Sequence, residues 1–149
     1  MLTALVLGGC ASGEVTEPLL PSAAPDGTSA PCQALVAALP DQLAGLDRTD
    51  SPAEGTALWR DADGTAVTLR CGVPPPEGYD DLATCQDIEG VAWFAPEEQV
   101  ADQSLDAVLT TVEQTPHVEL TVPASLRPPV AALVDVAPAV RDSLGSPGC

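Results

Sequence analysis

The chain has 149 residues, which is enough for one ordinary domain with a hydrophobic core. Its 5 basic residues are all arginines and stand against 22 acidic residues, so the formal net charge is -17. Nucleic acids and anionic lipid headgroups attract proteins mainly through clustered Lys and Arg side chains. This charge therefore excludes both as direct partners of the domain.

A short apolar run at the N-terminus ends in the residue order of a bacterial lipobox. Leu7, Gly8 and Gly9 stand directly before Cys10, in the order leucine, small, small, cysteine. Small side chains beside the cut suit a signal peptidase, and the new N-terminal cysteine offers a thiol that can carry diacylglycerol. We expect residues 1–9 to be a partial signal peptide, short and without a basic start, and Cys10 to be lipidated. The alternative is a hydrophobic terminus with an incidental cysteine.

The segment after Cys10 has the composition of a linker. Residues 11–30 are rich in Pro, Ser, Ala and Gly and have neither a helical nor a strand period. We therefore expect residues 10–30 to be the lipidated cysteine with a disordered tether, and residues 31–149 to be a single domain. No other segment approaches 18 apolar residues, so the lipid on Cys10 is the expected membrane attachment, on the extracytoplasmic face of the cell membrane.

The first half of the domain predicts a short helix followed by a hairpin. Residues 31–39 carry leucines and alanines at helical spacing, with Pro31 suited to the first turn and Pro40 ending the run. Two strands, 56–59 and 65–73, flank a polar turn. In the second strand, strict alternation puts Val67, Leu69, Cys71 and Val73 on one face and Thr68 and Arg70 on the other.

The second half predicts a stiff loop, three strands and a helix. Residues 74–81 form the proline-rich loop, and residues 90–95 read as a buried strand. Residues 105–112 and 116–122 form a second hairpin, with Val118, Leu120 and Val122 inward and His117, Glu119 and Thr121 outward. Residues 126–144 have a helical period, and Pro138 predicts a kink or break. The fold class is therefore α+β, an antiparallel sheet of about five strands with an N-terminal and a C-terminal helix packed on one face.

Four cysteines remain in the domain, and an even set outside the cytosol favours disulfides. Cys32, Cys71, Cys85 and Cys149 permit three pairings, and their places in the predicted elements favour Cys71 with Cys85 and Cys32 with Cys149. None of the spacings is C-x-x-C and the chain has one histidine, which argues against a zinc site. We expect no metal and no cofactor. Four buried free thiols are the alternative.

These residues resemble an actinobacterial lipoprotein family catalogued as a domain of unknown function, DUF3515. The resemblance rests on Cys32 with the following Leu-Val-x-x-Leu-Pro, on residues 69–73 (LRCGV), on Cys85 followed by residues 90–93 (GVAW), and on residues 116–123 (PHVELTVP). It covers nearly the whole of the domain. Residues 113–115 depart from it, because the family usually has Gly-Arg before the last strand. The resemblance implies an anchored, extracytoplasmic protein and supplies no catalytic residues.

Few side chains predict chemistry. His117 is the one general base that titrates near neutrality, but it lies on the outer face of a strand and no G-x-S-x-G nucleophile elbow exists. Asp61 and Asp63 before Gly64 resemble the start of a calcium loop, yet position 12 of that loop is Gly72 instead of Glu. Turn formation accounts for these acids equally well, so we predict no catalytic residues.

The best candidate binding surface is the proline-rich loop around Tyr79, with Arg70 and Trp93 nearby. We therefore expect a non-enzymatic binding or scaffolding module of the bacterial cell envelope. Its partner would be an envelope protein or a wall component that presents a basic or neutral face. A small cell-wall hydrolase using Asp or Glu is the first alternative, and a weak divalent-cation binder is the second.

Overall fold

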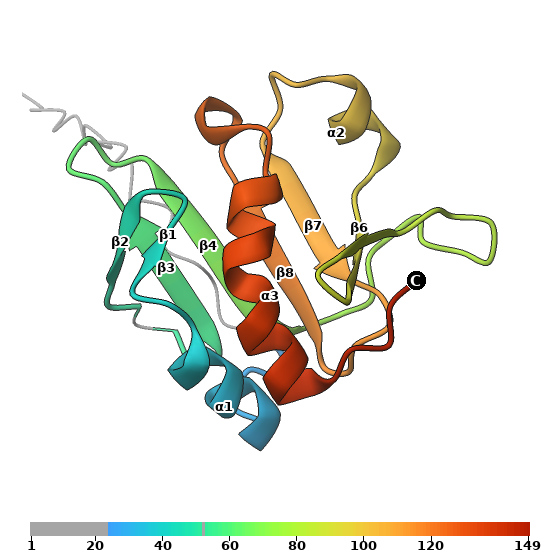
Figure 1. Ribbon diagram of the computed structural model, residues 1–149, viewed down its shortest axis with the longest axis horizontal. Coiled ribbons are helices and arrows are strands. Elements are labelled where there is room, and N and C mark those ends of the chain that lie inside the picture. The colour runs from blue at the N-terminus through green and yellow to red at the C-terminus, as the bar shows by residue number, and fades with distance from the viewer. Residues whose placement is uncertain (1–23, 52) are drawn as a thin grey trace, which may run out of the picture.

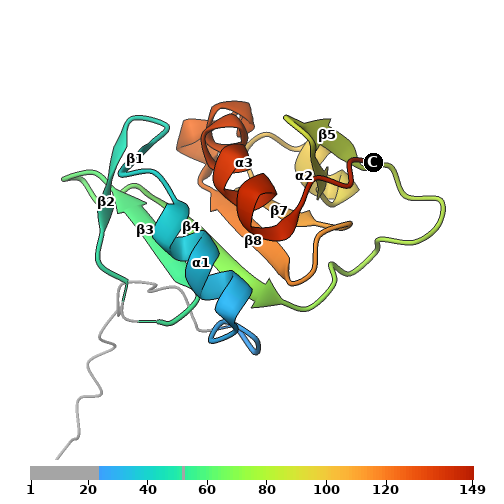
Figure 2. The ribbon, with the colours of Figure 1, turned by 60° about the horizontal axis from the view of Figure 1, so that its bottom comes forward.

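The computed structural model describes residues 24–51 and 53–149. Cys10, the lipobox and most of the expected tether lie outside these residues. The described part is an α+β fold with one antiparallel sheet and three α-helices, α1 (Ala30–Ala38), α2 (Glu97–Ala101) and α3 (Val130–Leu144), plus a short 3-10 helix, η1 (Ala124–Leu126). Helices α1 and α3 cover the same face of the sheet, and α2 lies near the end of β6 and β7 (Figures 1 and 2).

The sheet has eight strands in the order β1-β2-β3-β4-β8-β7-β6-β5. Their bounds are β1 (Gln42–Leu43), β2 (Leu46–Thr49), β3 (Thr56–Arg60), β4 (Ala66–Val73), β5 (Gln86–Ile88), β6 (Val91–Phe94), β7 (Ala107–Thr111) and β8 (His117–Val122). Every neighbouring pair is antiparallel. Strands β4 and β8 lie at the centre and join two hairpin systems that are far apart in sequence.

The strand count of about five is wrong, and the three additional strands are all short. β1, β2 and β5 have two to four residues each and lie at or next to the sheet edges. Such segments are too short to display an alternating pattern, and only their neighbours in the sheet make them strands. The five predicted strands, β3, β4, β6, β7 and β8, and both terminal helices lie where the sequence predicts them.

The faces of the long strands are as predicted except at the end of β4, where a register shift between Cys71 and Val73 pairs Val73 with His117 and places it on the opposite face. Val67, Leu69 and Cys71 of β4 and the three predicted inward residues of β8 belong to the hydrophobic core under α1 and α3. The core also contains both tryptophans, each fully buried. The Trp59 indole donates a hydrogen bond to the Pro40 carbonyl at 2.9 Å. Period-two alternation thus determined which side of the central sheet packs against the helices.

Helix α3 continues without a break through Pro138, so the predicted break does not occur. Proline has no N–H to donate to the carbonyl four residues earlier, which belongs to Val134. Both residues lie on the exposed side of α3, where water can replace the missing donor. The side of α3 that faces the sheet keeps its apolar residues, including Leu133, Val136 and Val140.

The domain begins earlier than expected. Residues 24–30, which composition assigns to the tether, lie against Gly72 of β4 and against Gly55, just before β3, and the Asp26 amide donates to the Gly72 carbonyl at 3.2 Å. A Cβ atom on Gly72 would lie 2.5 Å from the carbonyl carbon of Asp26, and one on Gly55 would lie 2.5 Å from the Cα of Gly27. Three chain segments therefore meet backbone to backbone, which only glycine allows. Composition could not reveal this contact.

The four domain cysteines form two disulfides, but the favoured pairing is wrong. Cys32 of α1 bonds to Cys71 of β4, and Cys85 bonds to Cys149 at the C-terminus. Helix α1 lies over β4, which brings Cys32 and Cys71 together in the core. The C-terminal tail returns past β5 to Cys85. Both pairings follow from helix placement on the sheet, which the order of cysteines along the chain does not encode.

Within the described residues, no helix combines the length and the apolarity needed to cross a membrane.

Candidate functional site

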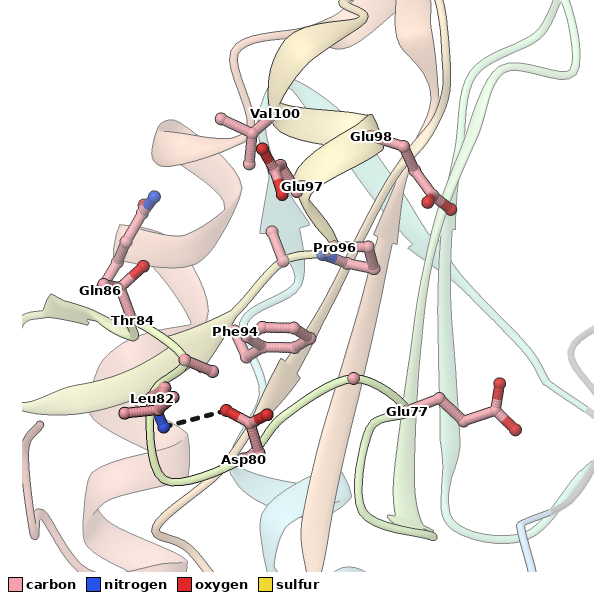
Figure 3. A pocket seen from close by; sticks show the side chains of 13 residues that line it. Glu77, Asp80, Leu82, Thr84, Gln86, Phe94, Pro96, Glu97, Glu98 and Val100 are labelled. Atoms are coloured by element: carbon pink, nitrogen blue, oxygen red, sulfur yellow. Dashed lines mark hydrogen bonds between the residues drawn. The ribbon is translucent and has the colours of Figure 1, made fainter.

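An open groove of about 870 Å³ lies between the β4–β5 loop and the segment formed by the end of β6 and α2 (Figure 3). The loop contributes one wall, α2 contributes the other, and Phe94 lies between them. The lining residues are Glu77, Gly78, Asp80, Leu82, Ala83, Thr84, Gln86, Phe94, Ala95, Pro96, Glu97, Glu98 and Val100.

The loop wall is held by side chains at its middle. The Tyr79 ring packs edge-on against Phe94 with 5.4 Å between the centroids, and its hydroxyl donates to Glu113 Oε1 at 3.3 Å. Asp80 Oδ1 accepts the Leu82 amide at 2.9 Å, which forms a tight turn and leaves the Leu82 side chain 91% exposed. Tyr79 thus supports the groove from behind Phe94, and Leu82 forms its apolar lip.

The environment of Tyr79 raises the pKa of its phenol above the ordinary value of 10.0. The first cause is the loss of hydration where the ring packs into the structure. The negative charge of Glu113 and the hydrogen bond to it add to this effect, followed by the charge of Asp81. The hydroxyl therefore stays protonated and keeps donating to Glu113 at physiological pH.

The α2 wall is fixed mainly by Arg127. Its guanidinium donates to the Gln99 carbonyl at 2.7 Å, to the Leu105 carbonyl at 2.9 Å and to the Gln103 side chain at 3.0 Å. After α2, the Ser104 hydroxyl and amide donate to Asp102, and these bonds lower the pKa of that carboxyl. Arg127 therefore connects α2, the following turn and η1 into one support for the groove.

The groove combines negative charge with exposed apolar surface. Glu77 and Asp80 come from the loop wall, and Glu97 and Glu98 from the first turn of α2. Leu82 and Val100, 91% and 52% exposed, are among the most exposed large apolar side chains of the described residues. The lining includes neither arginine nor histidine. The arrangement can bind a ligand that offers both positive charge and apolar groups.

The structure separates the three residues of the predicted binding surface. Tyr79 lies beside the groove, as the loop suggested. Arg70 lies on the outer face of β4, where its guanidinium pairs with Glu119 of β8 at 3.2 Å, outside the groove lining. Trp93 is fully buried, so its place in an exposed surface is wrong. Adjacent residues of a strand face opposite sides, so Phe94, the next residue, faces the groove instead.

His117 has a structural contact in the β7–β8 hairpin. Its Nδ1 lies 2.8 Å from the Thr111 carbonyl, an acceptor, so Nδ1 carries the hydrogen. His117 also borders a smaller pocket of about 330 Å³ together with Ser29 and Asp26. The Ser29 hydroxyl is buried and has no hydrogen-bond partner among the described residues. No serine-histidine hydrogen bond forms there.

The acidic turn between β3 and β4 is explained by hairpin chemistry. Asp61 Oδ1 accepts the amides of Asp63 and Thr65 at 3.0 and 2.8 Å, and Gly64 adopts a φ of 91°. This is the side-chain turn that Asp and Gly favour. Throughout residues 24–51 and 53–149, no three His, Cys, Asp or Glu side chains come close enough to hold one metal ion.

Comparison with known proteins identifies a family for the chain. Residues 2–147 match the family described as "Protein of unknown function (DUF3515)". Searches of curated proteins and of solved structures give no match. The family match covers the whole sheet, the groove and three of the four disulfide cysteines. It ends two residues before the fourth, Cys149. The chain therefore belongs to the DUF3515 family.

Proposed function

We propose that this protein is a non-enzymatic binding or scaffolding module of the bacterial cell envelope, held at the extracytoplasmic face of the membrane by lipid on Cys10. The observation that carries the binding role is the groove of about 870 Å³, whose lining combines four carboxylates with exposed apolar side chains. The lipobox order before Cys10 supports the anchor, and the two disulfides suit an oxidising compartment.

Fractionation of the native host tests the anchor. The wild-type chain is expected in the membrane fraction with a diacylglyceryl mass on Cys10, because two or more acyl chains hold a protein stably on a bilayer. Cys10→Ala is expected to remove the lipid and release the chain from membranes. An unmodified, reduced wild-type chain in the cell interior would contradict the proposal.

Crosslinking in intact cells tests the binding role. A photoreactive amino acid at position 82 places the probe on the exposed lip of the groove without disturbing the core, since Leu82 is 91% exposed. We expect one reproducible envelope protein to be captured. The same probe at position 63, in the β3–β4 turn, is the matched control and is expected to capture little.

A wall hydrolase is the competing proposal, because carboxylates also line the groove. Glycosidases that act on polymers use extended clefts with aromatic sugar-binding sites, and Phe94 is the one aromatic side chain among the groove's lining residues. Turnover of purified peptidoglycan by the chain, abolished by changing one of Glu77, Glu97 and Glu98 to Gln, would favour the hydrolase.

A weak divalent-cation binder is the other alternative. A melting temperature that rises with millimolar calcium would favour it.

A further inference from the structure

The carboxylates of the groove are spread around its rim. In Figure 3, Glu77 and Glu98 lie to the right of Phe94, Glu97 lies above the ring near Val100, and Asp80 lies below the ring. No three acidic side chains of the described chain converge as a metal site would require. Such a distribution suits a ligand with several separated positive charges better than it suits a single ion.

Within the described residues, none of the four carboxylates of the groove forms an ion pair. Arg48 donates to two carbonyls at the end of α1, Arg127 to two carbonyls below α2, and Arg141 to the Glu89 carbonyl. Arg70 pairs with Glu119 on the sheet. None of the five arginines of the chain, Arg60 included, lines the groove. The rim therefore keeps a potential that attracts cations.

The apolar part of the groove is fixed in place. The Asp80 turn holds Leu82 outward, and Tyr79 supports the ring of Phe94 from behind. Val100 is 52% exposed on the opposite wall, so apolar groups stand on both sides of the hollow. Large apolar side chains held in the open beside a hollow are typical of a binding surface.

We infer that the groove docks a polypeptide segment that carries lysine or arginine side chains interspersed with apolar ones. This inference rests on the proposed function and names the chemistry of its partner. Positive side chains would pair with the rim carboxylates, and an apolar side chain would pack between Leu82, Phe94 and Val100. The carboxylates favour a positively charged segment over anionic ligands. The apolar walls favour a segment that also carries apolar side chains over a polymer that carries charges alone.

The test uses the purified chain with both disulfides formed and three labelled synthetic peptides. One alternates lysine and leucine, the second alternates lysine and serine, and the third alternates glutamate and leucine. Fluorescence anisotropy gives the Kd of each. We expect the lysine-leucine peptide to bind at least tenfold more tightly than either of the others, with an affinity that falls as salt rises.

Matched variants locate the binding. Glu77→Gln/Glu97→Gln removes one charge from each wall, and Leu82→Ser removes the apolar lip. Each is expected to raise the Kd of the lysine-leucine peptide at least tenfold. Glu54→Gln/Asp63→Asn removes the same two charges from exposed positions at the other end of the sheet and is expected to leave the Kd within about twofold.

If the two double variants weaken peptide binding equally, net charge alone explains the binding, and the inference is wrong. Equal binding of the lysine-serine peptide, or displacement of the peptide by soluble peptidoglycan fragments, would do so as well. The cell crosslink separates this failure from that of the proposed function. A partner captured at another face would preserve the binding role and reject the groove, whereas the absence of any captured partner would reject the binding role itself.

Discussion

The two ends of the sheet are built differently. At one end, which we call the closed end, α1, β1–β4 and residues 24–29 meet through backbone contacts and a disulfide whose cysteines are both 0% exposed. At the groove end, the β4–β5 loop, β5, β6 and α2 are held by side-chain hydrogen bonds at the surface and by the Cys85–Cys149 disulfide. Stability is expected to concentrate in the first region and adaptability in the second.

Each end contains one fully buried tryptophan, which allows the two to be monitored separately. Trp59 lies at the closed end, and Trp93 is in β6 behind the groove. Trp59→Phe leaves tryptophan fluorescence from the groove end alone, and Trp93→Phe leaves it from the closed end alone. In urea denaturation these variants report on each end separately, and the predictions below start with the largest expected effect.

Removal of the disulfides is expected to distinguish the two ends most strongly. The loops of 39 and 64 residues give about 4 kcal/mol for either bond in the chain-entropy treatment. Cys32→Ala/Cys71→Ala is expected to lose about that much and some core packing as well. Cys85→Ala/Cys149→Ala is expected to lose about 2 kcal/mol, because the freed C-terminal residues gain freedom in the folded state. Urea denaturation measures both.

Mild thiol treatment gives an independent comparison of the same bonds. Cys149 is exposed and Cys85 partly exposed, whereas Cys32 and Cys71 are inaccessible. Thiol exchange depends on access, so mass spectrometry after alkylation should find Cys85 and Cys149 modified first. Simultaneous reduction of the two bonds would contradict the separation of the ends.

Gly72→Ala is expected to cost about 3 kcal/mol or more, since its φ of +85° is combined with a clash at 2.5 Å against the backbone of Asp26. Gly64→Ala is the matched control. Gly64 has a φ of +91°, but an added Cβ would meet nothing within 4 Å, so its cost should stay near 1 kcal/mol. If urea denaturation shows the same loss of unfolding free energy for both variants, the positive φ alone explains the loss, and the contact between the three segments contributes nothing.

Arg127→Ala is expected to loosen the groove end by about 1–2 kcal/mol, because its hydrogen bonds to the Gln99 and Leu105 carbonyls are lost. Amide hydrogen exchange should accelerate in α2 and the following turn, with little change in β3 and β4. Uniform acceleration over the whole sheet would show that Arg127 contributes to global stability and not to a local support.

The smallest expected effect is on the titration of Tyr79, the sole tyrosine of the chain. Its raised pKa means that the folded state retains the proton at a pH where the unfolded chain releases it. The corresponding contribution to stability is present below pH 10.0 and is lost as pH rises through the folded pKa. Absorbance at alkaline pH should give a midpoint above 10.0, and Glu113→Gln should lower that midpoint.

The sequence predicted those features that depend on local periodicity. Alternation in β8 and in β4 as far as Cys71 gave the correct faces, and the positions of proline and glycine gave the bounds of α1 and α3 to within a few residues. It missed β1, β2 and β5, whose pairing comes from their neighbours, and helix α2, whose five residues are too few to show a helical period. For the candidate site, it selected the loop of Tyr79 but added Arg70, which pairs with Glu119 outside the groove, and Trp93. Strand β6 is buried throughout, so no alternation indicated that Trp93 faces the core.

The amino-acid order by itself determined the charge, the family motifs and most of the inward faces of the central strands, and it supplies the residue order from which a lipobox is predicted. Only the tertiary structure decided the cysteine pairing, the contact of residues 24–30 with β4 and the groove between the β4–β5 loop and α2. Each of these joins segments far apart along the chain. Their meeting depends on how the helices pack across the sheet, which no local pattern encodes.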